Sequence, residues 1–132
     1  MRGPGTSVTF LSSTYDEALA LTRSARDYLA HQGPSERAGL TPEGRLIACR
    51  ESLRLTARLT QVMAWLLAQR AVEAGEIDRA EAARTRFRLA GQNVCAVSNP
   101  KAGELLPPRF NSLLEQSGAL YGRIARLDSM LD

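Results

Sequence analysis

A long stretch without helix breakers constrains the fold of this chain more than any other sequence feature. Thr41 is followed by Pro42, and apart from Gly44 no glycine or proline occurs again before Gly75. Threonine is a favoured N-cap, proline is favoured in the first helical turn, and glycine is favoured just beyond the last turn. The sequence therefore predicts one helix from Thr41 to Ala74, about 50 Å long at 1.5 Å per residue.

The apolar side of this predicted helix is wide. Two adjacent seams repeat at helical spacing. One consists of Leu53, Thr56, Thr60, Met63 and Leu67, and the other of Leu55, Leu59, Val62 and Leu66. At 100° per residue they cover about half of the circumference, whereas a single neighbouring helix needs a stripe of about 100°. We expect this helix to contact two neighbours, or one neighbour and a partner chain.

Two further long helices are predicted, one on each side of it in the chain. Residues 14–32 repeat apolar side chains at helical spacing, with Ser13 or Thr14 as the N-cap and Gly33 and the following proline as the end. From Pro108 to the C-terminus, apolar residues alternate in steps of three and four, as in a heptad seam. No strand or internal repeat is recognisable, so we expect an all-α three-helix bundle in a single domain of 132 residues.

The remaining segments carry weaker signals. Residues 1–12 are predicted to form a flexible arm, because glycine and proline are concentrated near its start. Asp78 is predicted to cap a short accessory helix that runs to about Arg88. Residues 89–106 contain several glycines, prolines and asparagines that break helices. An ordered loop of this length is uncommon in a compact domain, so a mobile loop is expected there.

The charge composition bears on the class of partner. The formal net charge is only +3, and Lys101 is the one lysine among 17 cationic residues. A bias towards arginine suits carboxylate or phosphate recognition, although a GC-rich genome is the alternative explanation. The sequence pI of about 9.3 motivates a nucleic-acid-binding or regulatory protein as an alternative function. The small net charge makes a nucleic-acid partner the less favoured interpretation.

The sequence also bears on location. No segment contains the 18 or more uncharged apolar residues needed to cross a bilayer, and residues 1–9 lack the apolar centre of a signal peptide. We therefore expect a cytoplasmic protein without a membrane span.

Residue types that carry catalysis or bind metals are scarce. His31 is the one histidine, in the last turn of the first predicted helix, where a cation interacts favourably with the helix dipole. Cys49 and Cys95 do not form a metal-site spacing with it. Cys49 is predicted to be a buried structural thiol, and Cys95 lies in the predicted loop, where a redox role has no further support. We expect no enzymatic activity, no metal site and no cofactor.

One polar pattern on the long helix is a candidate docking surface for another protein. Its members are Arg50, Arg54, Arg58, Gln61 and Trp65. They lie opposite the centre of the apolar face, and arginine and tryptophan are enriched at interface hot spots. The alternative is a solvated face on which Glu51 pairs with Arg54, with the tryptophan at the rim of the core. A weaker candidate is the exposed side of the last helix, which carries Arg123, Arg126 and Asp128.

Residues 51–72, ESLRLTARLTQVMAWLLAQRAV, resemble the central helix of the RcdA family, the regulators of CtrA degradation in alphaproteobacteria. Colinear segments extend the resemblance over nearly the whole chain. They are FL at 10–11, DEALAL at 16–21, RDYL at 26–29, EAGEI at 73–77 and LYGRIARLD at 120–128.

The resemblance implies a three-helix bundle that forms a homodimer. It also implies an adaptor that delivers protein substrates to the ClpXP protease during cell-cycle control. In that family the adaptor works with a primed protease, through a response-regulator partner, and with a cyclic-di-GMP-binding effector protein. Some members carry a C-terminal extension, whereas this sequence stops at Asp132, so no role of such an extension is carried over.

Overall fold

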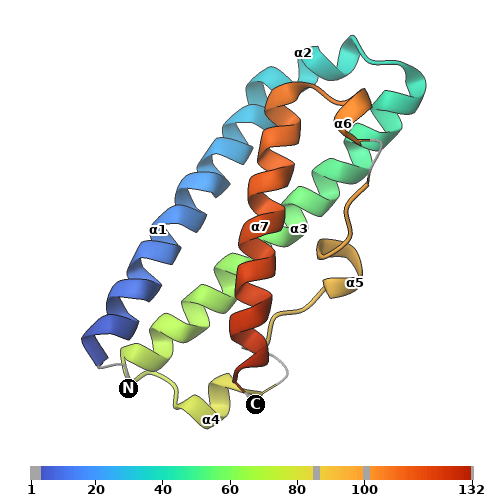
Figure 1. Ribbon diagram of the computed structural model, residues 1–132. Helices are drawn as coiled ribbons and strands as arrows, with labels where there is room; N and C mark the ends of the chain where they lie inside the picture. Colours follow the sequence, from blue (N-terminus) through green and yellow to red (C-terminus); the bar gives the residue numbers. More distant parts are fainter. Residues whose placement is uncertain (1–3, 85–86, 100–101, 132) are drawn as a thin grey trace.

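Three long helices form the body of the molecule in a computed structural model (Figure 1). They are α1 (Pro4–Asp27), α3 (Pro42–Glu73) and α7 (Pro108–Ser129), and α3 packs against both of the others. The structure describes residues 4–84, 87–99 and 102–131, with the side chains of residues 4–9 left aside. No strand occurs in these ranges, so the prediction of an all-α three-helix bundle is confirmed.

Helix α3 has the predicted bounds. Thr41 has an extended backbone, and its Oγ1 accepts a hydrogen bond from the amide of Gly44 at 3.0 Å. At the other end Gly75 adopts a φ of 77°, a conformation that glycine reaches without steric cost. No helix in the described ranges is long and apolar enough to cross a membrane.

The two predicted seams of α3 have different surroundings. The seam of Leu55, Leu59, Val62 and Leu66 is buried against α1 and α7. Helix α3 therefore contacts two neighbouring helices of the same chain, which confirms the first of the two arrangements expected for its wide apolar side. The other seam points outward, since Leu53 is 67% exposed and Leu67 is 51% exposed.

Helix α1 begins earlier than the sequence indicates. Residues 4–12 are helical, so the prediction of a flexible arm over residues 1–12 is wrong there, and residues 1–3 lie outside the described ranges. Ser13 and Thr14 consequently lie inside the helix rather than at its cap. Packing explains the extension, because Leu11 and Tyr15 pack against the core. The Arg70 guanidinium also lies 4.3 Å from the centre of the Tyr15 ring.

The predicted end of the first helix at residue 32 is also wrong. A π-helical turn, η1 (Tyr28–Gln32), leads directly into α2 (Gly33–Ala38). The Gly33 amide donates to the Tyr28 carbonyl, a longer-range bond than that of an α-helix. A proline in a regular α-helix loses one hydrogen bond and clashes with the carbonyl four residues earlier. The wider turn allows the chain to stay helical through Pro34.

The segment between α3 and α7 contains three short helices. They are α4 (Arg79–Ala82), α5 (Gln92–Cys95) and α6 (Ala102–Leu105). Asp78 caps α4 as predicted and accepts from the Glu81 amide at 2.7 Å, but this helix stops well before Arg88.

The prediction of a mobile loop over residues 89–106 is corrected by the packing of that segment. Its buried members are Leu89, Cys95, Ala102 and Leu106, all part of the hydrophobic core. Residues 100 and 101 lie outside the described ranges. Apolar anchors at intervals hold a segment that contains too many helix breakers to form a long helix of its own.

Candidate functional site

The five residues of the candidate docking surface mostly face another part of the same chain. That part is residues 88–97, here called the strap, which includes α5 and runs along the side of the bundle between α4 and α6 (Figure 1). Arg50 is exposed, Arg54 and Gln61 are partly buried, and Arg58 and Trp65 are buried. Arg54, Arg58 and Gln61 bind the strap, Trp65 binds Asp128 of α7, and of the five only Arg50 is exposed.

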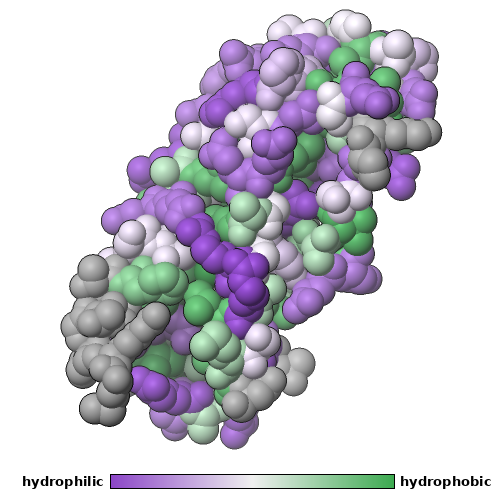
Figure 2. All heavy atoms as spheres, in the orientation of Figure 1, coloured by the Kyte–Doolittle hydropathy of each residue, from purple (hydrophilic) through white to green (hydrophobic). Residues whose placement is uncertain are grey.

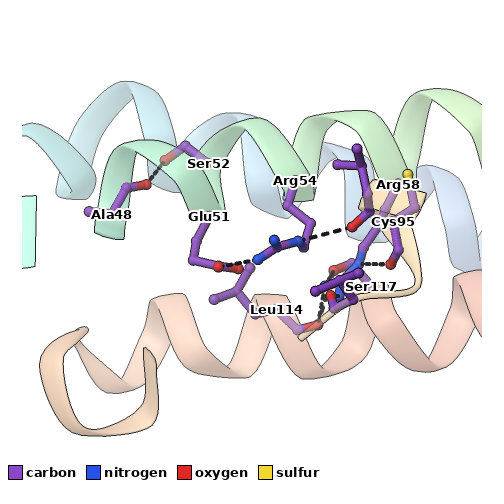
Figure 3. Close-up of polar contacts among 10 residues, drawn as sticks. Ala48, Glu51, Ser52, Arg54, Arg58, Cys95, Leu114 and Ser117 are labelled. Carbon is purple, nitrogen blue, oxygen red and sulfur yellow. Dashed lines mark hydrogen bonds and ion pairs between the residues drawn. The ribbon is translucent and has the colours of Figure 1, made fainter. Parts of the chain in front are cut away.

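Arg58 makes the largest number of these contacts (Figure 3). Its Nε donates to the Cys95 carbonyl at 2.8 Å, and its Nη2 donates to the Val97 carbonyl at 2.9 Å. On the other side, Nη1 donates to the Leu114 carbonyl at 3.0 Å and to Ser117 Oγ at 3.1 Å. One guanidinium thus joins α3, the strap and α7.

The electrostatic surroundings of Arg58 are unusual for an arginine. Its side chain is only 4% exposed, and the four acceptors named above are all uncharged. Burial lowers the pKa of Arg58, the nearby charge of Arg54 lowers it further, and Glu51 opposes the shift. Loss of this side chain would leave the buried Cys95 carbonyl and the Val97 carbonyl without this donor, and an unpaired buried acceptor costs more than an ordinary hydrogen bond contributes.

Arg54 and Glu51 form the local ion pair that the alternative interpretation expected (Figure 3). The Arg54 Nη1 pairs with Glu51 Oε1, and Nε donates to the Val94 carbonyl at 3.0 Å. Glu51 is buried rather than solvated. The expectation of a solvated face is therefore wrong for Glu51 and Arg58, while the predicted pairing with Arg54 is confirmed.

The start of the strap is held by a second set of contacts. The Ala90 amide donates to Gln61 Oε1 at 3.1 Å, and its carbonyl accepts from the Tyr121 hydroxyl at 2.8 Å. Burial raises the pKa of Tyr121 to about 12, with Cys95 and Asp128 adding to the shift. Ala90 is therefore bound on one side by α3 and on the other by α7.

Trp65 is part of a buried polar cluster and does not lie at the rim of the core. Its Nε1 donates to Asp128 Oδ1 at 2.9 Å. The same oxygen accepts from Arg88 Nε at 2.9 Å and from the Leu89 amide at 3.2 Å. Asp128 is buried, which corrects its placement on the exposed side of the last helix, whereas Arg123 and Arg126 are exposed as predicted.

Sequence reasoning placed Ser117, Tyr121 and Ile124 on the apolar seam of the last helix but missed Asp128, although a periodic signal was present. Ser117, Tyr121, Ile124 and Asp128 follow one another in steps of four, three and four, so they share one face of the helix. A buried tryptophan also needs an acceptor for its indole N–H. Together these signals point to Asp128 as an inward-facing acceptor.

The burial of the two cysteines differs from what the sequence indicates. Cys49 is exposed, so the prediction of a buried thiol is wrong for it. Cys95 is buried, and burial raises the pKa of its thiol while the Arg58 charge opposes the shift. His31 is exposed, within the π-helical turn. No group of three or more His, Cys, Asp or Glu side chains within the described part of the chain is arranged to hold a metal ion.

A second candidate surface lies on the outer side of α3. Its residues, here called the outer seam, are Leu46, Cys49, Leu53, Thr56, Thr60, Met63 and Leu67. They continue the exposed seam described above by one heptad towards the N-terminus, and they extend over about 31 Å of helix. All are exposed except Met63, which is partly buried.

An apolar groove adjoins this seam between α1 and α3. It has a volume of about 480 Å³, and Leu29, Leu59 and Met63 are among its lining residues. Exposed apolar seams in heptad spacing are typical of helix–helix contacts between chains. On the face formed by α7 and the strap, by contrast, hydrophobic residues appear as separate patches between hydrophilic ones (Figure 2).

Comparison with known proteins places the chain in a family. A family model described as "Protein of unknown function (DUF1465)" matches residues 4–132. The crystal structure of RcdA from Caulobacter crescentus CB15 aligns with a TM-score of 0.74 and 32% sequence identity. The alignment covers 92% of this chain and 89% of the Caulobacter chain. The chain belongs to the RcdA family.

This finding confirms the RcdA-family resemblance of residues 51–72 and the flanking segments. The likeness includes the three-dimensional arrangement of the helices. No curated protein matches the sequence. Two features of this RcdA-family chain bear on its function. They are the buried contacts that hold the strap and the exposed outer seam.

Proposed function

We propose that this protein is a non-enzymatic adaptor that helps deliver cell-cycle regulatory proteins to the ClpXP protease in the cytoplasm. The observation that carries the proposal is the likeness to Caulobacter RcdA over 92% of the chain at 32% identity. As the resemblance implies, a response-regulator priming factor and a cyclic-di-GMP-binding effector protein would be its other partners.

The geometry supports a binding role in two ways. The outer seam presents exposed leucines on a rigid helix, which is the arrangement that a protein interface requires. In addition, Cys95 and Tyr121 are nucleophile-type side chains whose pKa is raised by burial, opposite to the activation that a nucleophile needs. The described side chains thus favour contact with proteins over chemistry.

We further propose that a second copy of the chain covers the outer seam. Leucines at Leu46, Leu53 and Leu67 repeat at multiples of seven residues, so they form a continuous stripe along α3. Such a stripe pairs with an identical stripe about a twofold axis, because the same patch is used on both chains. Light scattering after size exclusion tests this proposal and should give twice the chain mass.

A matched pair of variants tests the surface itself. Leu53→Asp places a charge in the middle of the outer seam and should shift the measured mass towards that of one chain. Val94→Asp changes an exposed apolar residue of the strap and should leave the mass unchanged. A single-chain mass for the unmodified protein, or equal masses for both variants, contradicts the proposed dimer.

The adaptor proposal can be tested with purified components. Immobilised protein is mixed with ClpX, the receiver-domain priming factor and the cyclic-di-GMP effector, together and one at a time. We expect retention of the priming factor, and retention of ClpX only in its presence. Absence of binding to every component contradicts the proposal, and steeply salt-dependent binding to duplex DNA would support the nucleic-acid alternative instead.

A further inference from the structure

The strap is held chiefly through its main chain. Arg54 and Arg58 donate to the carbonyls of Val94, Cys95 and Val97. Gln61 and Tyr121 bind the amide and the carbonyl of Ala90, and Asp128 accepts from the Leu89 amide. These main-chain groups are present in any peptide, so this form of recognition depends little on sequence.

Arg88 is the one strap side chain with strong polar contacts, because its guanidinium pairs with Asp128 Oδ1 at 2.9 Å and donates to the Asp128 carbonyl at 2.7 Å. The other side chains of the strap contribute much less. Leu89 and Cys95 are buried, whereas Ala90 to Val94, Ala96 and Val97 are all exposed. A segment with few buried apolar contacts opens at lower free energy than the core around it. The strap is thus fixed by two apolar anchors, six residues apart, by the ion pair of Arg88 with Asp128, and by a row of hydrogen bonds.

We propose that the strap occupies a groove that binds a peptide with one helical turn, as the strap itself has in α5, and that a segment of a partner protein replaces it there. The walls of this groove are Arg54, Arg58 and Gln61 of α3 and Tyr121 and Asp128 of α7. The peptide that fits has an arginine directly before an aliphatic side chain and, six residues after that side chain, a small apolar one, with main-chain carbonyls free to accept hydrogen bonds. The proposal rests on the proposed function and deepens it, because it names a short peptide segment as the part of a partner that is bound.

Exchange of one peptide for another is easier than simple release of the strap. Arg58 and Asp128 are buried, and departure of the strap alone would remove partners that both need. An incoming peptide supplies the same carbonyl and amide groups. The groove therefore stays closed by the strap until a competing segment is present.

Gly91 offers a way to weaken the strap without altering the groove. Its φ of 76° lies in the left-handed region, which disfavours L-residues by roughly fivefold to thirtyfold in an equilibrium. Gly91→Ala should therefore raise the population of the released strap by about that factor. Gly75 has a φ of 77°, with nothing within 4 Å of an added Cβ, at the end of α3 and outside the strap. Gly75→Ala is the matched control.

The probe is a fluorescent synthetic peptide of residues 88–97 with alanine at the Cys95 position, and its binding is followed by anisotropy. Because affinity scales with the fraction of molecules whose groove is open, Gly91→Ala should bind roughly fivefold to thirtyfold more tightly than the unmodified protein. Gly75→Ala should bind as the unmodified protein does. A peptide that carries aspartate at the Leu89 position should not bind to any of them.

Hydrogen exchange shows whether the variant acts as intended. The amides of Leu89 and Ala90, which bind Asp128 and Gln61, should exchange faster in Gly91→Ala and not in Gly75→Ala. Unchanged exchange contradicts the claim that Gly91→Ala releases the strap. Faster exchange with no gain in peptide affinity contradicts the claim that the groove binds peptides. The test contains neither protease nor cargo, so the two proposals can fail separately. A negative result for peptide binding does not contradict the adaptor function, and a negative result for the adaptor function does not contradict peptide binding.

Discussion

Asp128 accepts a hydrogen bond from the indole nitrogen of Trp65 at 2.9 Å, and both side chains are buried. The bond joins α7 to α3, and the same carboxylate oxygen also receives Arg88 Nε and the Leu89 amide. One carboxylate therefore satisfies three donors from the bundle and the strap. Removal of a buried charge with several partners is among the most destabilising kinds of substitution.

Asp128→Ala should accordingly lower the free energy of unfolding by about 3–5 kcal/mol. Asp128→Asn keeps one oxygen acceptor and should lower it by only about 1–3 kcal/mol. Asp16→Ala, at an exposed position of α1, serves as a control and should stay within about 0.5 kcal/mol of the unmodified protein. Urea denaturation followed by Trp65 fluorescence gives these values, and equal effects of the Ala and Asn variants would contradict the role assigned to the acceptor.

The arginines of the line opposite the apolar face should differ sharply in their contribution to stability. Arg58→Met keeps much of the side-chain volume but removes the donor of the Cys95 and Val97 carbonyls and of Ser117 Oγ. We expect a loss of about 2–4 kcal/mol in denaturant unfolding, since several buried acceptors are affected.

Arg50→Met is the matched change at the exposed end of the same line, and it should alter stability by less than about 0.5 kcal/mol. If instead both variants unfold at the same denaturant concentration as the unmodified protein, Arg58 is not the structural link described. Arg58→Lys should fall between the two, because an ammonium group cannot reach the strap and α7 with the geometry of the planar guanidinium.

Alkaline pH should destabilise the fold through Cys95 and Tyr121. Burial raises the pKa of both groups above their ordinary values of about 8.5 and about 10, and that of Tyr121 reaches about 12. The unfolded chain then loses these protons at lower pH than the folded chain, so stability falls as pH rises. Their contribution is fully present below about pH 8.5, declines first through Cys95, and declines further above about pH 10 through Tyr121.

Measurement of the unfolding free energy at pH 7, 9 and 10.5 checks this dependence. Tyr121→Phe should be less stable at pH 7, because the bond to the Ala90 carbonyl is lost. Its stability should decline less steeply than that of the unmodified protein above about pH 10. Parallel pH curves for the two proteins would contradict the burial of the hydroxyl as the cause.

Thiol labelling should separate the two cysteines. Cys49 lies in the outer seam and is exposed in the single chain, so it should react readily with a thiol reagent in the Leu53→Asp variant, in which the seam is uncovered. Cys95 belongs to the strap and its side chain is buried in the core, and burial raises the pKa of its thiol, so it should react much more slowly and only through opening of the strap. Mass spectrometry of labelled peptides resolves the sites, and similar rates would contradict the described packing of residues 88–97.

The sequence determined the long helices because their signals are local. Thr41 and Gly75 mark the ends of α3 through their own backbone and side-chain chemistry. The predicted end at Gly33 failed for a different reason. A π-helical turn accommodates the proline, and the buried side chain of Tyr28 beside it belongs to the core. Tertiary packing there outweighs a local breaker.

The burial of Arg58 and Trp65 within the candidate docking surface was not predicted, because only its own line of residues was considered. Glu51, Leu55, Arg58, Val62 and Trp65 follow one another in steps of four and three, so they lie on one buried face of α3. The sequence does not indicate which segment packs against that face of α3. The strap comes from residues about 30 to 40 positions further along the chain, and its main-chain groups carry no sequence signal.

Degradation of a cell-cycle regulatory protein by purified ClpXP, with the priming factors present, tests the central claim most directly. The initial rate is measured as a function of the concentration of this protein. We predict a saturable increase of several-fold that requires the priming factors, and no loss of the substrate when ClpXP is omitted. An initial rate that stays constant at every concentration, with folded protein and active ClpXP, would contradict the adaptor function.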